Sequence, residues 1–292
     1  MGRRSPGYDG DVVDESGNGA RTQQAGDGRL SGGAEGIADA PRIALAAWRD
    51  GPQALWLIRH GQSEGNVIRD EAEHRDAEEY VLGTRDADVP LSDLGRQQAE
   101  AFGRWLAEQP ADRQPDVVLV SPYLRAAQTA DHVLEAAGLS HLARGVDERL
   151  RDREMGEWDG LTWRGIKARH PQEAERAQLV GRFYHRPPGG ESWADICLRL
   201  RTLLADVARE LPGRRVLVVA HDVVIQLVRV LVDGLSEADA VELVARTSYA
   251  NCGLTTMEQD GGRLGLDRYN WTVPVNEQGE PATRSADAPA GR

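Results

Sequence analysis

The chain has 292 residues, 40% of them hydrophobic, which is enough for one large domain or two small ones. Its formal net charge of −12 argues against broad binding to nucleic acids or to anionic membranes, and no apolar run is long enough to span a bilayer. The two cysteines, Cys197 and Cys252, are too few for a disulfide framework and lack metal-ligand spacing. Because this cysteine usage favours a reducing compartment, we expect a cytoplasmic protein.

Both ends of the chain are polar. Residues 1–42 are rich in Gly, Asp, Ser and Arg and almost free of large apolar side chains. Such a composition cannot offset the entropy lost on folding, so we predict a disordered N-terminal tail. Residues 276–292 are similarly polar, with Pro and Ala, and we predict a second disordered tail there. The folded unit is then a single domain over residues 43–275.

The first predicted element is a buried strand over residues 55–58, a short run that is entirely apolar. It ends at Arg59 and His60, and open α/β sheets bind ligands at the carboxyl ends of their strands. Arginine offers a planar donor fork for a phosphate, and a neutral histidine can act as a nucleophile toward it. Gly61 would let the backbone approach the anion, and Asn66 could add a side-chain donor. The alternative is a strand end with incidental polar residues. Further phosphate-binding residues farther along the chain are needed to distinguish the two interpretations.

The next elements bring a second arginine to a strand end. Residues 67–80 carry alternating charges and predict an exposed helix or an ordered loop. Ser92 is a good N-cap for the amphipathic helix that follows it. Residues 117–120 predict a second buried strand, and the helix expected to begin at Pro122 places Arg125 in its first turn. The positive end of a helix favours anions, although a solvated arginine would be the default interpretation elsewhere in a chain.

A polar region follows. Residues 147–160 are loop-like and carry many acids, and residues 163–185 predict a polar, helical insertion whose aromatic side chains could close over a site. Ser192 then caps another amphipathic helix.

The last part of the chain repeats the pattern of the first strand. Residues 215–220 predict a third apolar strand, and it too ends at a histidine, His221. An apolar helix over residues 223–232 follows, and residues 251–258 and 263–269 predict a pair of strands joined by a tight turn. Strands that alternate with helices predict an α/β fold with helices on both faces of the sheet. Neighbouring strand ends would bring His60 and His221 together with the two arginines.

These stretches resemble the histidine phosphatase superfamily, the phosphoglycerate mutase-like proteins with an Arg-His-Gly motif. The similarity covers almost all of residues 54–270 in family order, and several motifs in one order are more specific than one pattern. The matching segments are residues 57–66, 90–95 (Pro-Leu-Ser-Asp-Leu-Gly), 121–129 (Ser-Pro-Tyr-Leu-Arg-Ala-Ala-Gln-Thr), 190–192 (Gly-Glu-Ser) and 218–221 (Val-Val-Ala-His). The resemblance implies a three-layer α/β/α sandwich with a mostly parallel central sheet.

It also implies roles for particular residues. His60 corresponds to the nucleophile that is transiently phosphorylated. Arg59, Arg125 and His221 correspond to the pocket that holds the phosphoryl oxygens, with help from Asn66. Phosphoryl transfer needs charge compensation on three oxygens, and these side chains would supply it without a metal or a cofactor.

The resemblance leaves two candidates for the acid/base carboxylate. The family pattern before Gly156 places Asp152 at this position, where Glu is more common, and Glu154 is a rival. A loop acid paired with a neighbouring arginine is the alternative for either residue. As the general acid, Asp152 would need a raised pKa, which Trp158 or Trp163 could provide by shielding it.

A second departure from the family pattern is Asp222, because a glycine often follows the histidine that here is His221. Two interpretations remain open. Asp222 could place a negative charge in the first turn of the next helix, or it could keep His221 protonated.

We therefore expect a phosphatase that hydrolyses a phosphomonoester through a phosphohistidine. Two alternatives remain: a phosphoglycerate mutase-type phosphotransferase and a weakly active regulatory protein that binds a phospho-ligand. The expected partner is a small-molecule phosphomonoester, with no nucleic acid or membrane, and a homodimer is an open option. The insertions at residues 67–88 and 157–189 should set the specificity.

Overall fold

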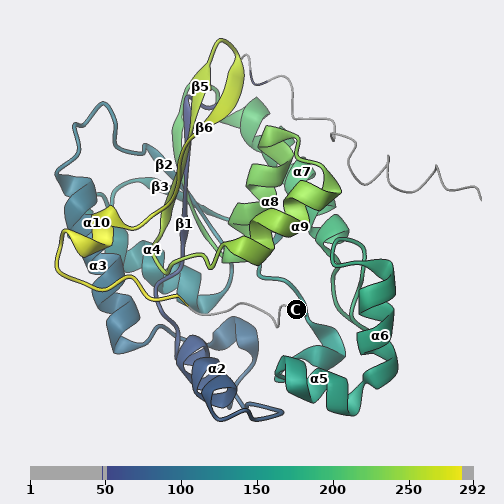
Figure 1. Cartoon of the computed structure of the whole chain (residues 1–292). Coiled ribbons are helices and arrows are strands. Elements are labelled where there is room, and N and C mark those ends of the chain that lie inside the picture. Colours follow the sequence, from purple (N-terminus) through teal and green to yellow (C-terminus); the bar gives the residue numbers. More distant parts are fainter. Residues whose placement is uncertain (1–47, 49–50, 285–292) are drawn as a thin grey trace, which may run out of the picture.

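A six-stranded mixed sheet forms the centre of the computed structural model, which describes residue 48 and residues 51–284 (Figure 1). The strands follow the order β3-β2-β4-β1-β5-β6. They are β1 (Ala54–Arg59), β2 (Val117–Val120), β3 (Ala143–Val146), β4 (Arg215–Ala220), β5 (Leu254–Asp260) and β6 (Arg263–Trp271). The first four in spatial order run parallel, and β5 and β6 are antiparallel to their neighbours. The N-terminal tail predicted for residues 1–42 and residues 285–292 lie outside the described residues.

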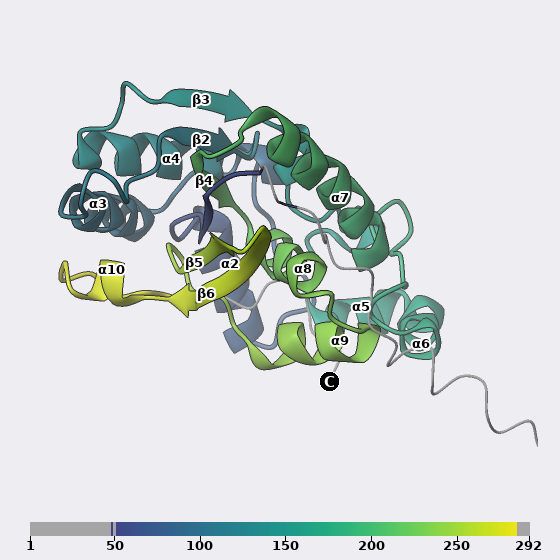
Figure 2. The same cartoon turned by 90° about the horizontal axis from the view of Figure 1, so that it is seen from above.

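Helices cover both faces of the sheet, so the predicted three-layer α/β/α fold is confirmed (Figures 1 and 2). One face carries α3 (Asp93–Ala107), α4 (Leu124–Ala137) and α10 (Val273–Asn276), and the other carries α7 (Trp193–Glu210), α8 (Asp222–Asp233) and α9 (Glu237–Arg246). Successive residues of β1 point to opposite faces. Trp56 and Ile58 join the apolar cluster with α3 and α4, whereas Leu55 and Leu57 join the cluster with α7 and α8.

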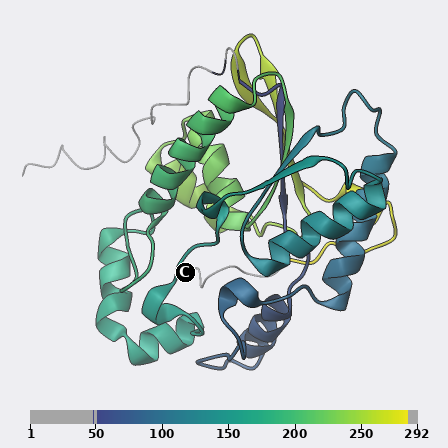
Figure 3. The ribbon, with the colours of Figure 1, turned by 180° about the vertical axis from the view of Figure 1, so that it is seen from behind.

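The remaining helices gather at the end of the sheet to which β1 leads (Figures 1 and 3). They are α2 (Glu64–His74), η1 (Asp86–Asp88), η2 (Glu148–Leu150), η3 (Gly156–Trp158), α5 (Trp163–Arg169) and α6 (Pro171–Val180). A small separate core of Trp158, Leu161, Ile166 and Ala174 holds α5 and α6 together. The insertion after β3 is therefore a packed substructure beside the carboxyl ends of the strands.

Two local predictions differ from the structure. The helix expected from Pro122 begins two residues later, at Leu124, because Tyr123 is the N-cap residue in an extended conformation. The edge strand β3 was not predicted, since its Ala-Arg-Gly-Val sequence is mostly exposed and lacks an apolar run. The helix after Ser92 is confirmed as α3, whose cap is a hydrogen bond from the Gly95 amide to the Ser92 hydroxyl.

The chain beyond α10 packs against the domain. The Gln98 amide donates to the Pro281 carbonyl oxygen (2.7 Å) and to the Thr283 hydroxyl (2.9 Å), and that hydroxyl donates to the side chain of Asn251. These contacts reach past residue 275, where we had placed the end of the folded unit. In the part of the chain described, no helix is both long and apolar enough to cross a membrane.

Candidate active site

The two histidines at the strand ends lie side by side. Arg59 of β1 pairs with Ala220 of β4 in the parallel register, so the next residues, His60 and His221, leave the sheet at the same level. Their rings meet edge to face with centroids 5.2 Å apart. The prediction that neighbouring strand ends bring these two side chains together is confirmed.

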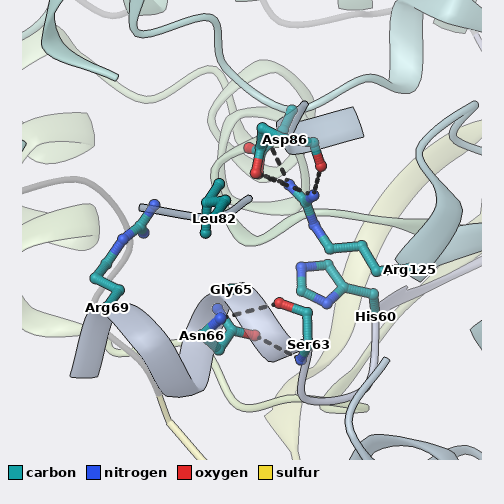
Figure 4. Close-up of a pocket in the computed structure, with 9 residues that line it drawn as sticks. His60, Ser63, Gly65, Asn66, Arg69, Leu82, Asp86 and Arg125 are labelled. Carbon is teal, nitrogen blue, oxygen red and sulfur yellow. Dashed lines mark hydrogen bonds and ion pairs between the residues drawn. The ribbon is translucent and has the colours of Figure 1, made fainter. Parts of the chain in front are cut away.

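A cavity opens beside them, and four of the predicted site residues line it: His60, Asn66, Arg125 and Asp152 (Figure 4). Its other lining residues are Ser63, Gly65, Arg69, Leu82 and Asp86. Arg59 and His221 are fully buried next to this lining. The Arg59 guanidinium donates to the carbonyl oxygen of Tyr249, and its charge acts on His60.

The environment of His60 fixes both its tautomer and its charge. Nδ1 lies 2.7 Å from the Gly61 carbonyl oxygen, and because a carbonyl can only accept, Nδ1 carries the proton. The lone pair is then on Nε2. Burial and the charges of Arg125, Arg59 and His221 lower the pKa of His60 well below its ordinary value. His60 is therefore a neutral imidazole at neutral pH, which is the nucleophilic form.

Gly61 has a packing role that the sequence did not reveal. A Cβ atom at this position would lie 2.4 Å from the backbone oxygen of Gly95, at the start of α3. The Gly61 amide donates to the Thr129 hydroxyl at 3.0 Å, so it is already engaged. Close approach of two backbone segments thus explains why glycine stands after His60.

Asn66 is held by the first turn of α2. Its amide oxygen accepts from the Ser63 backbone N–H (3.1 Å), while the Ser63 hydroxyl accepts from the Asn66 N–H, which forms a capping box. Because the oxygen of the Asn66 side chain is used in this way, its NH₂ group is the part that can donate to an anion in the cavity.

Arg125 is no solvated helix arginine, since only 4% of its side chain is exposed. Two carboxylates hold its guanidinium. Nη2 lies 3.0 Å from one oxygen of Asp86 and 2.9 Å from Oδ2 of Asp152, and Nη1 donates to the Asp86 carbonyl oxygen at 2.6 Å. The Tyr123 ring also lies under the guanidinium, with its centroid 4.9 Å away.

Asp86 was missed by the sequence analysis. It stands in a run of charged residues that looks solvated in the sequence, and no pattern there marks one acid above the others. In the structure its carboxylate occupies the donor fork of Arg125, which is the group expected to bind a phosphate (Figure 4). An anion that enters the cavity must compete with this carboxylate for the arginine.

Removing that charge should strengthen anion binding. We expect Asp86→Asn to lower the dissociation constant of inorganic phosphate about tenfold, because the entering anion no longer meets a fixed negative charge. Isothermal titration calorimetry measures the change. Asp88→Asn is the matched control, since Asp88 belongs to the same short helix but pairs with the exposed Arg85. If Asp86→Asn binds phosphate as strongly as the wild type or more weakly, Asp86 does not compete with phosphate for Arg125.

Asp152, rather than Glu154, reaches the cavity. Its Oδ2 lies 2.9 Å from Arg125 and 3.3 Å from Nδ1 of His221. Glu154 is exposed and accepts a hydrogen bond of 3.0 Å from the Tyr123 hydroxyl. Of the two rival acids, the geometry favours Asp152.

The expected raised pKa of Asp152 is wrong. Burial raises the pKa of this carboxyl, but His221, Arg125 and a hydrogen bond from the Arg153 amide outweigh it, and the pKa lies well below its usual value. Neither Trp158 nor Trp163 lines the cavity that Asp152 lines. Trp158 packs edge to face on Trp163 and stacks on His185, with ring centroids 6.2 Å and 5.0 Å away.

His221 is held from both sides. Its Nε2 lies 2.8 Å from the Ser121 hydroxyl, and its Nδ1 faces Asp152. Burial lowers the pKa of His221, although the Asp152 carboxylate acts in the opposite direction. Asp222 takes the structural role of the two we considered: its carboxylate accepts the Val223 N–H at the start of α8.

Comparisons with known proteins find related sequences and related structures. The profile of the histidine phosphatase superfamily (branch 1) matches residues 55–272. A 2,3-bisphosphoglycerate-dependent phosphoglycerate mutase from Methylobacterium radiotolerans is 36% identical over 197 residues, 66% of this chain and 85% of the mutase. The mycobacterial glucosyl-3-phosphoglycerate phosphatase solved with VO3 is 31% identical with a TM-score of 0.58, and the match covers 75% of this chain and 99% of the phosphatase chain. The alpha-ribazole phosphatase from Shigella flexneri, 21% identical, shares the fold with a TM-score of 0.60 over 75% of this chain and 96% of its own.

Proposed function

This chain belongs to the histidine phosphatase superfamily, and from that membership we propose that it hydrolyses a phosphomonoester through a phosphohistidine at His60. The observation that carries the proposal is the state of His60. Its proton is on Nδ1, its pKa is depressed, and it lies in the wall of a cavity that also contains Arg125. A neutral imidazole beside a guanidinium suits attack on a bound phosphoryl group.

In the first step, Nε2 of His60 attacks phosphorus and the ester P–O bond breaks. Arg59, Arg125 and the Asn66 amide compensate the charge on the phosphoryl oxygens. His221 lies edge to face with the His60 ring and contacts Asp152, so it forms the buried border of this pocket. The leaving oxygen takes a proton from Asp152, and the alcohol departs.

Asp152 must gain a proton before it can act, because its pKa is depressed in the structure. Binding of the substrate's phosphate explains how Asp152 becomes protonated. The phosphate draws on Arg125, whose charge helps to hold the Asp152 carboxylate ionised, and it adds a like charge nearby. Substrate binding should therefore raise the pKa of Asp152.

In the second step, the Asp152 carboxylate takes a proton from water, and the water oxygen attacks phosphorus. The P–N bond breaks, and inorganic phosphate leaves with His60 again neutral. After the second step His60 is again neutral and Asp152 is again protonated, as both were when the first step began.

The test is hydrolysis of p-nitrophenyl phosphate together with isolation of the phosphoenzyme. A phosphohistidine is labile to acid and stable to base, which distinguishes it from a phosphoserine. Labelled phosphate bound to wild-type protein after quenching in base supports the proposal, and hydrolysis without any such adduct contradicts it.

A phosphoglycerate mutase activity is the second candidate, and the 36% identity to the Methylobacterium radiotolerans mutase favours it. A mutase returns the phosphoryl group from histidine to the substrate, whereas a phosphatase gives it to water. Conversion of 3-phosphoglycerate to its 2-phospho isomer, primed by 2,3-bisphosphoglycerate, separates the two. We expect release of inorganic phosphate to exceed isomer formation.

Vanadate should inhibit far more strongly than phosphate does. It adopts a trigonal-bipyramidal geometry around its metal, as phosphorus does in the transition state, and transition-state analogues bind at least about 10²-fold more tightly than ground-state ligands. We expect at least this ratio between the inhibition constants of phosphate and vanadate. Similar inhibition constants would indicate a passive anion site and would favour the weakly active regulatory protein that binds a phospho-ligand.

Other features of the proposal rest on composition. We propose that the enzyme works in the cytoplasm, because its two cysteines are both buried and do not form a disulfide framework. We also propose that it needs no metal or cofactor, since its own arginines provide positive charge, and that its substrate is a small molecule rather than a nucleic acid. The match over residues 55–272 supports a single phosphatase domain.

A further inference from the structure

We infer that Asn251 and Thr283 are positioning residues that orient the side-chain amide of Asn66 through a chain of hydrogen bonds. The C-terminal segment, residues 280–284, would then contribute to phosphate binding without touching the substrate. The inference rests on the proposed phosphatase function, and it concerns how a phosphate donor is held in place. The segment lies beyond residue 272, where the match to the family profile ends.

The C-terminal segment returns to the carboxyl end of β1 after α10. In Figure 1 this last part of the described chain is drawn in yellow, and it turns back beside α3 toward the end of β1. The Asn251 backbone N–H donates to the Thr283 carbonyl oxygen at 2.9 Å, and Gln98 of α3 donates to the Pro281 carbonyl oxygen. No residue of the segment lines the cavity, so its influence on the site must pass through other residues.

A directed chain of hydrogen bonds joins the segment to the loop that follows the nucleophile. It begins at the Gln62 backbone N–H, which donates to Oε1 of Gln98 at 2.9 Å, so the NH₂ group of Gln98 faces the segment. That NH₂ group donates to the Thr283 hydroxyl, which in turn donates to Oδ1 of Asn251, both at 2.9 Å. The NH₂ group of Asn251 then donates to the His60 carbonyl oxygen at 3.0 Å. A backbone donor at one end and a backbone acceptor at the other fix the direction of every bond between them.

The same NH₂ group of Asn251 also reaches Asn66. Its nitrogen lies 3.4 Å from Oδ1 of Asn66, the oxygen that accepts from the Ser63 backbone N–H at 3.1 Å. If the Asn66 amide turned over, its NH₂ group would meet these two donors, so it stays directed away from them. Asn251 and Gln98 are completely buried, where a polar side chain costs free energy unless it is paired. The chain of hydrogen bonds therefore holds a phosphate donor in one orientation.

The turn that carries Asn251 has an uncommon backbone conformation. Cys252 has a φ of +52°, in the left-handed region that residues with a Cβ atom rarely adopt. Its N–H donates to the Arg59 carbonyl oxygen at 3.1 Å and lies 3.4 Å from the His60 carbonyl oxygen. Such a conformation persists only where the surrounding structure determines it. The contacts with the end of β1 thus fix the position from which Asn251 reaches Asn66.

Thr283→Val removes the hydroxyl and nearly keeps the shape of the side chain. The buried oxygen of Asn251 loses its donor, and Asn66 is no longer held in one orientation. We expect kcat/KM for p-nitrophenyl phosphate to fall about fivefold, the size of one buried hydrogen bond. The dissociation constant of inorganic phosphate, measured by calorimetry, should rise by a similar factor.

Two further variants test the chain itself. Thr283→Ser retains the hydroxyl and should keep the wild-type values. Asn251→Asp retains the shape of the side chain, but it presents an oxygen instead of an NH₂ group to the oxygens of His60 and Asn66. It should therefore lose more activity than Thr283→Val does. Thr202→Val is the matched control, because Thr202 is an exposed threonine of α7, and its activity should equal that of the wild type.

A double-mutant cycle separates positioning from a general structural role. In an Asn66→Ala background no amide is left to orient, and the His60 carbonyl keeps its contact with the Cys252 N–H. Adding Thr283→Val should then change kcat/KM and phosphate binding by less than about twofold, the usual error of additivity. Circular dichroism checks that each variant is folded. If Asn66→Ala is unfolded, Asn66→Asp replaces it, because its two equivalent oxygens still accept from Ser63 but have no orientation to lose.

Wild-type values in Thr283→Val or in Asn251→Asp overturn the inference. So does a loss of more than about twofold when Thr283→Val is added to the Asn66 variant, since Thr283 would then act elsewhere. Either result leaves the phosphatase proposal intact. If the wild type does not hydrolyse p-nitrophenyl phosphate, the proposed function fails, whereas phosphate binding by the same variants still tests how Asn66 is oriented.

Discussion

Replacement of His60 by alanine should reduce hydrolysis of p-nitrophenyl phosphate by a factor of at least about 10⁴, the scale seen when a covalent nucleophile is removed. The reason is local: the cavity wall contains one imidazole whose Nε2 lone pair is available, and the Gly61 carbonyl holds it in that tautomer. The phosphoenzyme should disappear together with turnover. Both are measured on the same preparation, by steady-state kinetics and by trapping in base.

The matched control is His141→Ala, because His141 is exposed and lies outside the cavity. It should turn over at the wild-type rate. Circular dichroism and the melting temperature show whether His60→Ala remains folded. Wild-type-like turnover in a folded His60→Ala variant would remove His60 from the mechanism.

The pH profile gives an independent check on His60. Attack requires the neutral imidazole, so kcat/KM falls as the pH decreases through the pKa of His60. Burial and the neighbouring charges of Arg125 and Arg59 place this pKa well below the ordinary 6.5. The acidic limb of the profile assigned to His60 should therefore lie below pH 6.5.

The second large effect is expected for Asp152→Asn with alkyl phosphates. A poor leaving group needs a proton, so loss of the acid should slow phosphoenzyme formation about 10²- to 10⁴-fold with an alkyl ester. A p-nitrophenolate leaves without a proton, so its first step should change little. Breakdown of the phosphohistidine would still be slow, and a burst of p-nitrophenol followed by slow turnover is expected. Stopped-flow absorbance measures both phases.

Glu154→Gln separates the two candidate acids. Glu154 contacts Tyr123 rather than the cavity, so this variant should show no dependence on the leaving group. The opposite result, with the dependence in Glu154→Gln and not in Asp152→Asn, would make Glu154 the acid. If neither variant shows it, the Asp at position 152 is too short for efficient acid catalysis, and the phospho-ligand binder becomes the better description.

The site residues that could be predicted from the sequence are those that follow directly after a strand. His60 and His221 each follow a short apolar strand, and parallel strands place their carboxyl ends at one edge, so their meeting follows from topology alone. Arg125 could be placed for the same reason, just beyond β2. The edge strand β3 offered no such pattern because its side chains are exposed.

The rest of the site depends on distances between side chains of different elements, which a sequence pattern does not give. Asp86 and Arg69 come from charged segments that are indistinguishable from solvated surface in a sequence. The low pKa of Asp152 arises from Arg125 and His221, which approach from other elements at 2.9 Å and 3.3 Å. The family resemblance pointed to an acid at this position, but only the packing shows which charges it meets.

The pairing of β1 with β4 also has a consequence for how the protein acquires activity. These adjacent strands are separated by more than half of the chain, and α2, α3, β2, α4, β3 and the α5–α7 region lie between them in sequence. Closing so long a segment is slow compared with forming local contacts. A nascent chain that has exposed the Arg-His-Gly motif therefore has no phosphate site until β4 has been synthesised and inserted between β1 and β2. Recovery of catalysis during refolding should consequently report completion of the central sheet, later than the appearance of helix.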